Sequence, residues 1–261
     1  MYIDVHCHLS EAEFSEVGGV AQTVRRAEEN GVGLMIVSGC EPASFEQVKE
    51  FAEAHESVYF CVGFHPSEAH KCTKEGLNKI RALCAHEKCV AVGEIGLDYH
   101  FDDNPSPETQ RECFHQHLVL ADELGLPVVI HSRDAAKETL DFLKERKHLL
   151  KKGGLMHCYS YSAEMMREFM DLGMKFSFGG PCTFKNANKV QECIRCIPAP
   201  LLLSETDCPY LTPVPFRGVF PNEPKNVKHV VEQMATLRNE NLEELQKQIY
   251  ANAKELFFKL K

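Results

Sequence analysis

The chain has 261 residues, of which 44% are hydrophobic and 26% charged, the balance of an ordinary globular protein. This composition excludes a largely disordered chain, and no apolar run approaches the roughly 18–20 residues that a membrane span needs. The first residues do not combine a basic segment with an apolar one, so we expect no secretory signal and a cytoplasmic location. The 12 cysteines are therefore predicted to be mostly buried, reduced thiols.

The chain is acidic, with 29 basic and 38 acidic residues and a net charge of −9. Proteins that bind DNA without sequence preference usually carry a basic face, because phosphate neutralisation supplies most of that affinity. A DNA or small phosphodiester substrate would therefore have to be held locally, by a metal or a few arginines. We expect no membrane contact and infer no obligate protein partner.

Eight short runs rich in Val, Ile, Leu and Phe alternate with segments of helical spacing. The predicted strands are Tyr2–Leu9, Gly33–Gly39, Tyr59–Phe64, Val90–Gly96, Val128–Ser132, Gly154–Tyr159, Lys175–Gly180 and Leu201–Asp207. The predicted helices are Ala43–His55, Lys74–His86, Gln110–Leu124, Ala135–Lys147, Ala163–Leu172, Lys185–Cys196, Lys225–Leu237 and Leu242–Leu260. Eight such units favour an α/β fold of the TIM (β/α)8 barrel type, with an open doubly wound sheet as the alternative. No linker divides the chain, so residues 1–261 are predicted to form one domain.

Metal-type ligands recur where the predicted strands end. On a strand, residues i and i+2 point to the same side, so His6 and His8 can face one point at the barrel mouth. Four further residues of this kind stand at or near the ends of other strands: Glu94, His131, His157 and Asp207. Buried polar groups need partners, and a divalent metal site at the C-terminal face of the strands satisfies all six together. The pair His115 and His117 has the same spacing but lies in a predicted helix, where i and i+2 do not share a face.

Six ligands are too many for one tetrahedral ion and suit two. A plausible division gives His6, His8 and Asp207 to one ion and His131 and His157 to the other, with Glu94 as the bridge. The imidazole-rich set favours zinc, manganese or iron over a pure magnesium site, although the sequence does not settle the metal. Two such ions activate a shared water for hydrolysis.

Four further residues are candidates for weaker roles. His65 ends the third predicted strand and faces the mouth, where it contacts a substrate phosphate or orients a ligand. Arg133 and Arg217 are the cations best placed on mouth-side loops, with surface ion pairs as their alternative. Glu205 stands two residues before Asp207 and is a candidate to orient a ligand from behind.

An ordered series of motifs resembles the TatD family of metal-dependent hydrolases across nearly the whole chain. The motifs are Ile3-Asp4-Val5-His6-Cys7-His8-Leu9, Gly63-Phe64-His65-Pro66, Gly93-Glu94-Ile95-Gly96-Leu97-Asp98-Tyr99, Val129-Ile130-His131-Ser132-Arg133-Asp134-Ala135, Met156-His157-Cys158-Tyr159-Ser160, Phe176-Ser177-Phe178-Gly179-Gly180 and Glu205-Thr206-Asp207-Cys208-Pro209-Tyr210-Leu211. The resemblance implies a TIM barrel, a two-metal centre with the six ligands above, and deoxyribonuclease activity of the 3′–5′ exonuclease type. It also implies that His65 lies near the substrate phosphate.

The segment Arg217–Pro224 departs from the family pattern. The family usually has two residues between Arg-Gly and Asn-x-Pro, whereas this chain has three, Val219, Phe220 and Pro221. The apolar run also occupies a place where a basic residue is common.

The sequence leaves three functions open. In a two-metal deoxyribonuclease, Asp207 orients or deprotonates the attacking water and Glu94 bridges the ions. In an amidohydrolase acting on an amide, lactone or phosphoester, a carbamylated lysine often takes the bridging place that Glu94 holds here. A degenerate scaffold without catalysis would have lost ligands, and all six are present.

Overall fold

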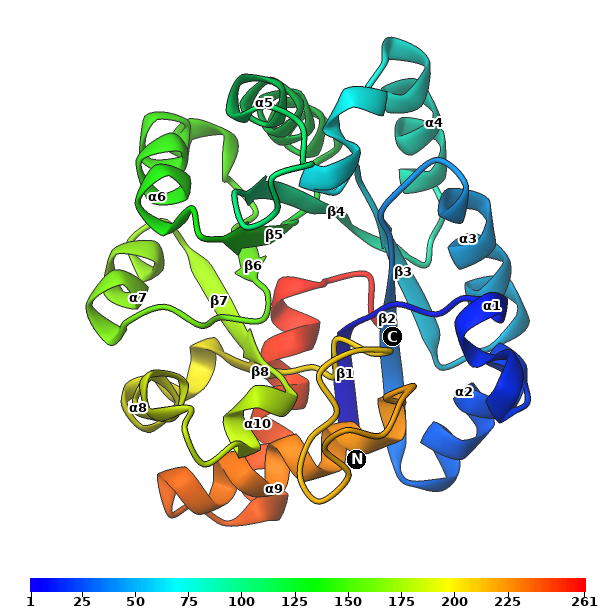
Figure 1. The fold of residues 1–261 in the computed structure, drawn as a ribbon, viewed down its shortest axis with the longest axis vertical. Helices are drawn as coiled ribbons and strands as arrows, with labels where there is room; N and C mark the ends of the chain where they lie inside the picture. The colour runs from blue at the N-terminus through cyan, green and yellow to red at the C-terminus, as the bar shows by residue number, and fades with distance from the viewer.

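Eight parallel strands form one sheet in the order β1 to β8, each paired with its neighbours along the chain. The computed structural model describes all residues 1–261, and in Figure 1 the strands surround a common centre with the helices outside them. The strands are β1 (Tyr2–Cys7), β2 (Val32–Gly39), β3 (Val58–Val62), β4 (Cys89–Asp98), β5 (Val128–Arg133), β6 (Gly154–Met156), β7 (Met174–Phe178) and β8 (Leu202–Ser204). Because the strands are buried by helices on one side and the barrel interior on the other, they are apolar almost throughout.

Helices cover the outside of the barrel and pack apolar stripes against it. They are α1 (Glu11–Phe14), α2 (Gly19–Glu29), α3 (Ser44–Ala54), α4 (Lys74–Cys84), α5 (Pro107–Leu124), α6 (Ala136–Glu145), α7 (Ala163–Met170), α8 (Asn188–Cys196), α9 (Val227–Arg238) and α10 (Leu242–Leu256). In α2, which the sequence analysis did not name, Val20, Val24 and Ala27 recur at helical spacing and are buried. The predicted (β/α)8 barrel is confirmed, and the open sheet is excluded.

The first and last strands meet without a regular ladder between them. Their junction is closed near the mouth by backbone hydrogen bonds from Asp207 N–H to the His6 carbonyl (3.0 Å) and from His8 N–H to the Cys208 carbonyl (2.7 Å). Deeper in the barrel, Ser204 Oγ donates to the Ile3 carbonyl at 2.8 Å. The residues that close the barrel are therefore the neighbours of the predicted ligands, or the ligands themselves.

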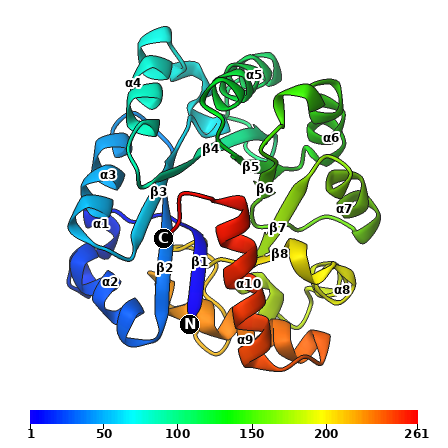
Figure 2. The ribbon, with the colours of Figure 1, turned by 180° about the vertical axis from the view of Figure 1, so that it is seen from behind.

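The two ends of the barrel differ. At the N-terminal ends of the strands, α10 packs on β1 and β8, as seen from behind in Figure 2. Lys259 Nζ donates to the Cys84 carbonyl at 3.0 Å and anchors the chain terminus at the same end. No helix combines the length and apolar character that crossing a bilayer requires. The opposite end is left to the loops that follow the strands, where barrel enzymes build their sites.

Five strands, β1, β3, β6, β7 and β8, end two or three residues earlier than predicted, and the last residues of β6 and β8 matter for the site. β6 stops at Met156 and β8 at Ser204, so His157, Glu205 and Asp207 follow strands instead of ending them. The backbone leaves the extended conformation at Cys158 (φ 45°) and Asp207 (φ 53°), which a strand ladder does not tolerate. These bends turn the side chains at the strand ends toward the barrel axis.

Candidate metal centre

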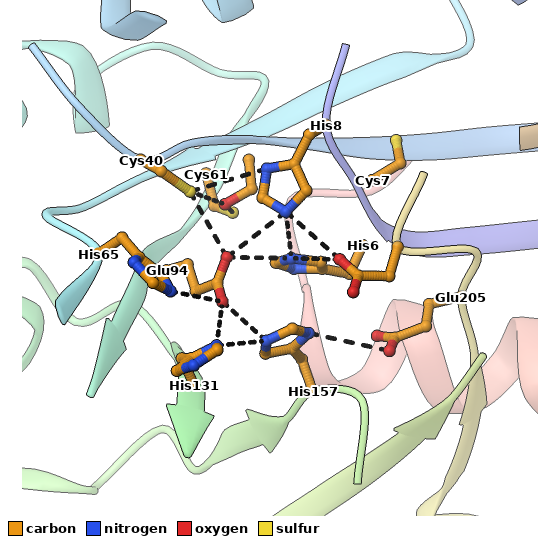
Figure 3. Close-up of polar contacts among 12 residues, drawn as sticks. His6, Cys7, His8, Cys40, Cys61, His65, Glu94, His131, His157 and Glu205 are labelled. Atoms are coloured by element: carbon orange, nitrogen blue, oxygen red, sulfur yellow. Dashed lines mark hydrogen bonds and ion pairs between the residues drawn. The ribbon is translucent and has the colours of Figure 1, made fainter. Parts of the chain in front are cut away.

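The first of two groups of donor atoms joins the two ends of the chain. His6 Nε2 lies 3.1 Å from His8 Nε2 and 3.2 Å from Glu94 Oε2. Asp207 Oδ1 lies 3.4 Å from His8 Nε2 and 3.8 Å from His6 Nε2. The structure thus brings together four predicted ligands from the end of β1, from β4 and from the segment after β8, and Figure 3 labels three of them, His6, His8 and Glu94.

The second group shares Glu94 with the first. Its other carboxylate oxygen, Oε1, lies 2.7 Å from His131 Nδ1 and 2.7 Å from His157 Nε2. The two imidazole nitrogens are 3.2 Å apart. Figure 3 shows Glu94 between the two groups, with one oxygen toward each. The side chains are grouped as in the predicted division, and their roles as ligands of two ions stay a prediction.

Two glycines let β4 carry Glu94 into this position. A Cβ atom on Gly93 would lie 2.7 Å from the Val129 carbonyl oxygen, and one on Gly96 would lie 1.9 Å from the His131 carbonyl oxygen. Gly96 also has φ 145°, a conformation that side chains disfavour. Only glycine at these two places allows β4 and β5 to approach closely enough for Glu94 to reach His131.

Two of the predicted ligands have a carboxylate behind them, at hydrogen-bond distance in the first case and farther away in the second. His131 Nε2 lies 3.0 Å from Asp98 Oδ2, so Asp98 directs the other ring nitrogen toward Glu94. His157 Nδ1 lies 3.8 Å from Glu205 Oε1, whose second oxygen accepts a hydrogen bond from Ser177 Oγ at 2.5 Å. Glu205 therefore lies behind His157, the place proposed for a ligand-orienting residue.

Asp4 lies beneath the centre and ties β1 to the segment after β8. Its carboxylate accepts from Thr206 N–H at 2.9 Å and from Thr206 Oγ1 at 2.5 Å. Burial raises the pKa of Asp4 to about 8, although the bonds from Thr206 act in the opposite direction. Asp4 and Asp98 were both missed from sequence, yet each stands an even number of residues from a ligand on its own strand. Side chains two or four residues apart on a strand point to the same side, so the spacing that placed His6 and His8 together also places Asp4 and Asp98 on the side of the ligands.

Cys40, directly after β2, is another missed neighbour. Its Sγ lies 3.4 Å from Glu94 Oε2 and 3.7 Å from His8 Nδ1 (Figure 3). Burial raises the pKa of this thiol above its ordinary value, and the Glu94 charge adds to the effect. A lone cysteine after a strand carries no signal that distinguishes it from the other thiols of the chain.

The charges in the centre are mutually dependent. Burial favours the neutral form of Glu94, but the charges of His157 and His6 outweigh it and hold the Glu94 pKa well below its usual range. Burial likewise lowers the pKa of His157, yet Glu94 more than offsets this and the pKa of His157 is raised well above its ordinary value. The pKa of His6 is lowered by burial and by His157. Glu94 is thus an anion that needs positive charge beside it.

The donor set fits divalent metal ions. His6 Nε2 and His8 Nε2 face each other among two carboxylate oxygens, an arrangement with more acceptors than protons. Three buried polar atoms of the centre have no hydrogen-bond partner: His6 Nδ1, His157 Nδ1 and Glu205 Oε1. A cation among the converging nitrogens and oxygens would accept their lone pairs. The proton of each imidazole would then lie on the ring nitrogen that points away from the cation.

The centre opens into a cavity of about 400 Å³ at the barrel mouth. Six carboxylates line it, against a single arginine, Arg133. The guanidinium of Arg133 lies 4.9 Å from the centre of the Phe101 ring at the rim. A phosphate would be repelled from so acidic a cavity unless cations neutralised it first.

His65 lies at the cavity and begins a 3₁₀ helix, Pro66–Lys71. Its Nδ1 accepts from Ser67 N–H at 3.2 Å, which leaves the proton of a neutral ring on Nε2. Burial and the neighbouring His131 lower the pKa of His65 to about 3, so the ring is neutral. Its Nε2 lies 3.8 Å from Glu94 Oε1 and is directed into the centre.

The candidate Arg217 lies away from the centre, and so does His117, which the sequence analysis had set aside. Arg217 lines a separate hollow, where its guanidinium stacks on Phe184 at 4.1 Å from the ring centre. His117 is buried in α5, where it accepts from Phe64 N–H at 3.2 Å and its Nδ1 lies 2.7 Å from the Cys113 carbonyl oxygen. Both nitrogens of His117 are occupied, in agreement with a structural role.

A parallel eight-stranded barrel with buried imidazoles and carboxylates at its mouth defines a metal-dependent hydrolase. The model of the TatD-related DNase family matches residues 3–258, and the chain belongs to this family. It is 42% identical over 257 residues to YabD of Bacillus subtilis strain 168, an uncharacterized metal-dependent hydrolase, covering 98% of this chain and 99% of the relative.

The solved structures agree. The crystal structure of YjjV, a TatD homologue from Escherichia coli K12, is 33% identical, with a TM-score of 0.90 over 98% of both chains. A lactonase from Deinococcus radiodurans has a TM-score of 0.66 at 14% identity, covering 98% of this chain and 95% of that one. The second likeness shows the fold alone.

Proposed function

We propose that the protein hydrolyses phosphodiester bonds in DNA, as a deoxyribonuclease of the 3′–5′ exonuclease type that uses two divalent ions. The observation that carries the proposal is the position of Glu94, with one oxygen in each of two donor groups. His6, His8 and Asp207 would hold one ion, and His131 and His157 the other. Zinc, manganese and magnesium are the candidate ions, of which zinc and manganese suit the four imidazoles better.

When bound, such ions neutralise the carboxylates, lower the pKa of water and stabilise charge on phosphoryl oxygens. The residues of the chain supply the rest. Asp207 is held in the left-handed conformation at φ 53° and remains an anion, because the hydrogen bond from His8 and the charge of His157 outweigh burial and lower its pKa. As an anion it could orient the attacking water by accepting a hydrogen bond, and it could take the proton of that water once bound ions had lowered the pKa of the water.

His65 and Arg133 would hold the substrate phosphate. His65 is neutral with its proton on Nε2, so it donates to a phosphoryl oxygen without competing for an ion. Arg133 is the only arginine that lines the cavity. Since the cavity has little other positive charge, substrate binding should depend on the metals.

The test is an activity screen of the metal-stripped protein reconstituted with zinc, manganese or magnesium. The substrates are labelled single- and double-stranded DNA, with a lactone, a dipeptide and a simple ester in parallel. We expect DNA cleavage that requires metal and shortens the strand from its 3′ end. Lactone or dipeptide turnover far above DNA turnover would assign the protein to the amidohydrolase alternative instead, and no turnover with any loaded metal would refute both.

A variant pair tests the role of the phosphate contact. His65→Ala should lower kcat/KM for DNA by about 10- to 100-fold, the effect of one hydrogen bond to a charged group, and leave metal content unchanged. His70→Ala is the matched control, because His70 is exposed on the same 3₁₀ helix. Equal loss on DNA and on a neutral ester would show that His65 supports the structure instead of the phosphate.

A further inference from the structure

The exposed apolar side chains of the protein gather at the barrel mouth. Nine large hydrophobic residues are exposed, and two of them, Met1 and Phe258, lie elsewhere. The other seven lie on two loops that follow strands: Phe101, Tyr210, Leu211, Val214, Phe216, Val219 and Phe220. Six of these seven belong to one segment between β8 and α9, residues 209–221, here called the mouth loop (gold in Figure 1). Single exposed apolar residues are ordinary, but a concentration of this kind marks a binding surface.

The mouth loop is held by its backbone while its side chains face outward. Thr212 Oγ1 donates to the Val219 carbonyl at 2.6 Å and closes the loop on itself. Asn222, fully buried, donates from Nδ2 to the Tyr210 carbonyl at 2.8 Å. Val214 N–H donates to Thr183 Oγ1 at 2.9 Å. These bonds fix the loop in place, so the exposed rings form a preorganised surface.

The mouth loop lines a hollow of about 390 Å³ that adjoins the metal cavity. Tyr210 belongs to the walls of both, so its ring lies between the metal cavity and the hollow. The ring centres of Tyr210 and Phe220 are 6.3 Å apart. On the other side, the Arg217 guanidinium lies on the Phe184 ring. Three aromatic rings and one guanidinium are thus among the nine residues that line the hollow.

This surface fits an unpaired nucleobase. Every base offers a flat apolar face that stacks on aromatic rings and on guanidinium planes. A paired base inside a duplex does not expose this face. The hollow would therefore bind the end of a single strand in preference to a duplex. The protein has a net charge of −9 and a single arginine at its metal cavity, so phosphate contacts supply little affinity. Stacking supplies affinity that does not depend on a basic surface.

We propose that Tyr210, Arg217 and Phe220 form a stacking subsite for the unpaired nucleobase next to the scissile phosphate. The proposal rests on the proposed function, because the base is brought there by a phosphodiester held at the metal centre. It also assigns a role to the departure of this chain from the family pattern, since two of the three residues after Gly218, Val219 and Phe220, are exposed in the mouth loop. A membrane surface or a protein partner at the same loop would be a different outcome of the test.

The direct test is fluorescence. The chain contains no tryptophan, so Phe220→Trp introduces a single reporter in the hollow. Oligothymidylate should quench this reporter, whereas the same strand without bases at its last two 3′ nucleotides should not. Phe258→Trp is the matched control, because Phe258 is 51% exposed and lies away from the mouth loop. Quenching in neither variant, or equally in both, would overturn the proposal, and so would quenching by lipid vesicles alone.

A kinetic test accompanies it with the metal-loaded protein. Phe220→Ala and Phe220→Leu should each raise KM for a single-stranded 3′ end by about 5- to 100-fold, the usual effect of one stacked base, and leave turnover of the strand with abasic 3′ nucleotides unchanged. The loss should be similar at low and high salt. Equal losses on both strands would indicate a structural effect and refute the subsite. If the wild type cleaves no phosphodiester but oligothymidylate quenches the Phe220→Trp variant, the proposed function fails, and the mouth loop is a base-binding surface without a scissile phosphate beside it.

Discussion

The hydrogen bond between Asp98 and His131 provides a test of how the second ion is held. Asp98 is 2% exposed, and its Oδ2 lies 3.0 Å from His131 Nε2, while its Oδ1 accepts from His100 N–H at 2.9 Å. In Asp98→Asn one oxygen becomes an NH₂ group. If the NH₂ group is turned toward His131, it faces the N–H at Nε2 of that ring. The clash is avoided only if the ring proton moves to Nδ1, the nitrogen that faces Glu94. If the NH₂ group is turned toward His100, it meets the backbone N–H.

In either orientation of the amide, one of its hydrogen-bond donors faces another donor instead of an acceptor. Loss of an outer-shell partner of this kind usually lowers metal affinity about 10- to 100-fold, equivalent to about 1.4–2.7 kcal/mol. Because Asp98 contacts only the second donor group, we expect the loss for one ion and less than about a threefold change for the other.

The assay is calorimetric titration of metal-stripped protein with manganese or zinc, in which the two ions bind as separate events. Asp134→Asn is the matched control, since Asp134 pairs with His100 at 2.7 Å but is 63% exposed and does not reach His131. An equal loss for both ions in Asp98→Asn would refute the assignment of His131 to a separate site. Unchanged binding would show that the orientation of His131 does not depend on Asp98.

Four further outcomes follow from the structure. Glu94→Gln should lower turnover by several orders of magnitude and weaken retention of both ions, and near wild-type turnover with full metal content would show that Glu94 is not the bridge. Removing both metals should lower the thermal midpoint by about 10–20 °C, because each ion at 100 times its Kd stabilises the fold by about 2.7 kcal/mol, and calorimetry with and without chelator measures this shift. Burial lowers the pKa of His117 to about 4 from about 6.5 when unfolded, so the unfolded chain binds more protons between these values and stability falls as pH falls. Urea unfolding should show a loss of about 2 kcal/mol from this residue between pH 7 and pH 5 that is missing in His117→Gln. Finally, DNA affinity should depend weakly on salt, with a logarithmic slope equivalent to about one to three phosphates, and a steep slope would reveal a basic surface that we have not identified.

The barrel could be predicted because its physical signals are local. Short apolar runs recur between helical segments, and each run ends with residues that the strand geometry turns toward one point. His6 and His8 could be assigned to one face from their spacing alone. Single histidines such as His131 and His157 could be predicted as ligands because they occur at the same position, the end of a strand, in successive strand–helix units.

Other parts of the site depend on distances that the sequence does not contain. Cys40 approaches Glu94 only because β2 and β4 converge at the mouth, and nothing near Cys40 in the chain indicates this. Arg217 follows β8 as expected, but the path of the mouth loop carries it to Phe184 instead of the metal cavity. Asp4 and Asp98 were indicated by the period of two, yet an aspartate beside a ligand also suits a ligand role, so only the contacts identify what each one holds.

The closure of the barrel has a consequence for how the protein matures. The first donor group joins His6 and His8 to Asp207, about two hundred residues later in the chain, and the same segments close the junction of β1 with β8. Contacts of such long separation form late, because closing a long loop costs entropy before the contact stabilises anything. During synthesis, the ligands on β1 emerge first and have no complete site until the last strand has left the ribosome. An ion held by the first donor group would therefore bind only after the barrel has closed, and it would not act as an early nucleus for folding.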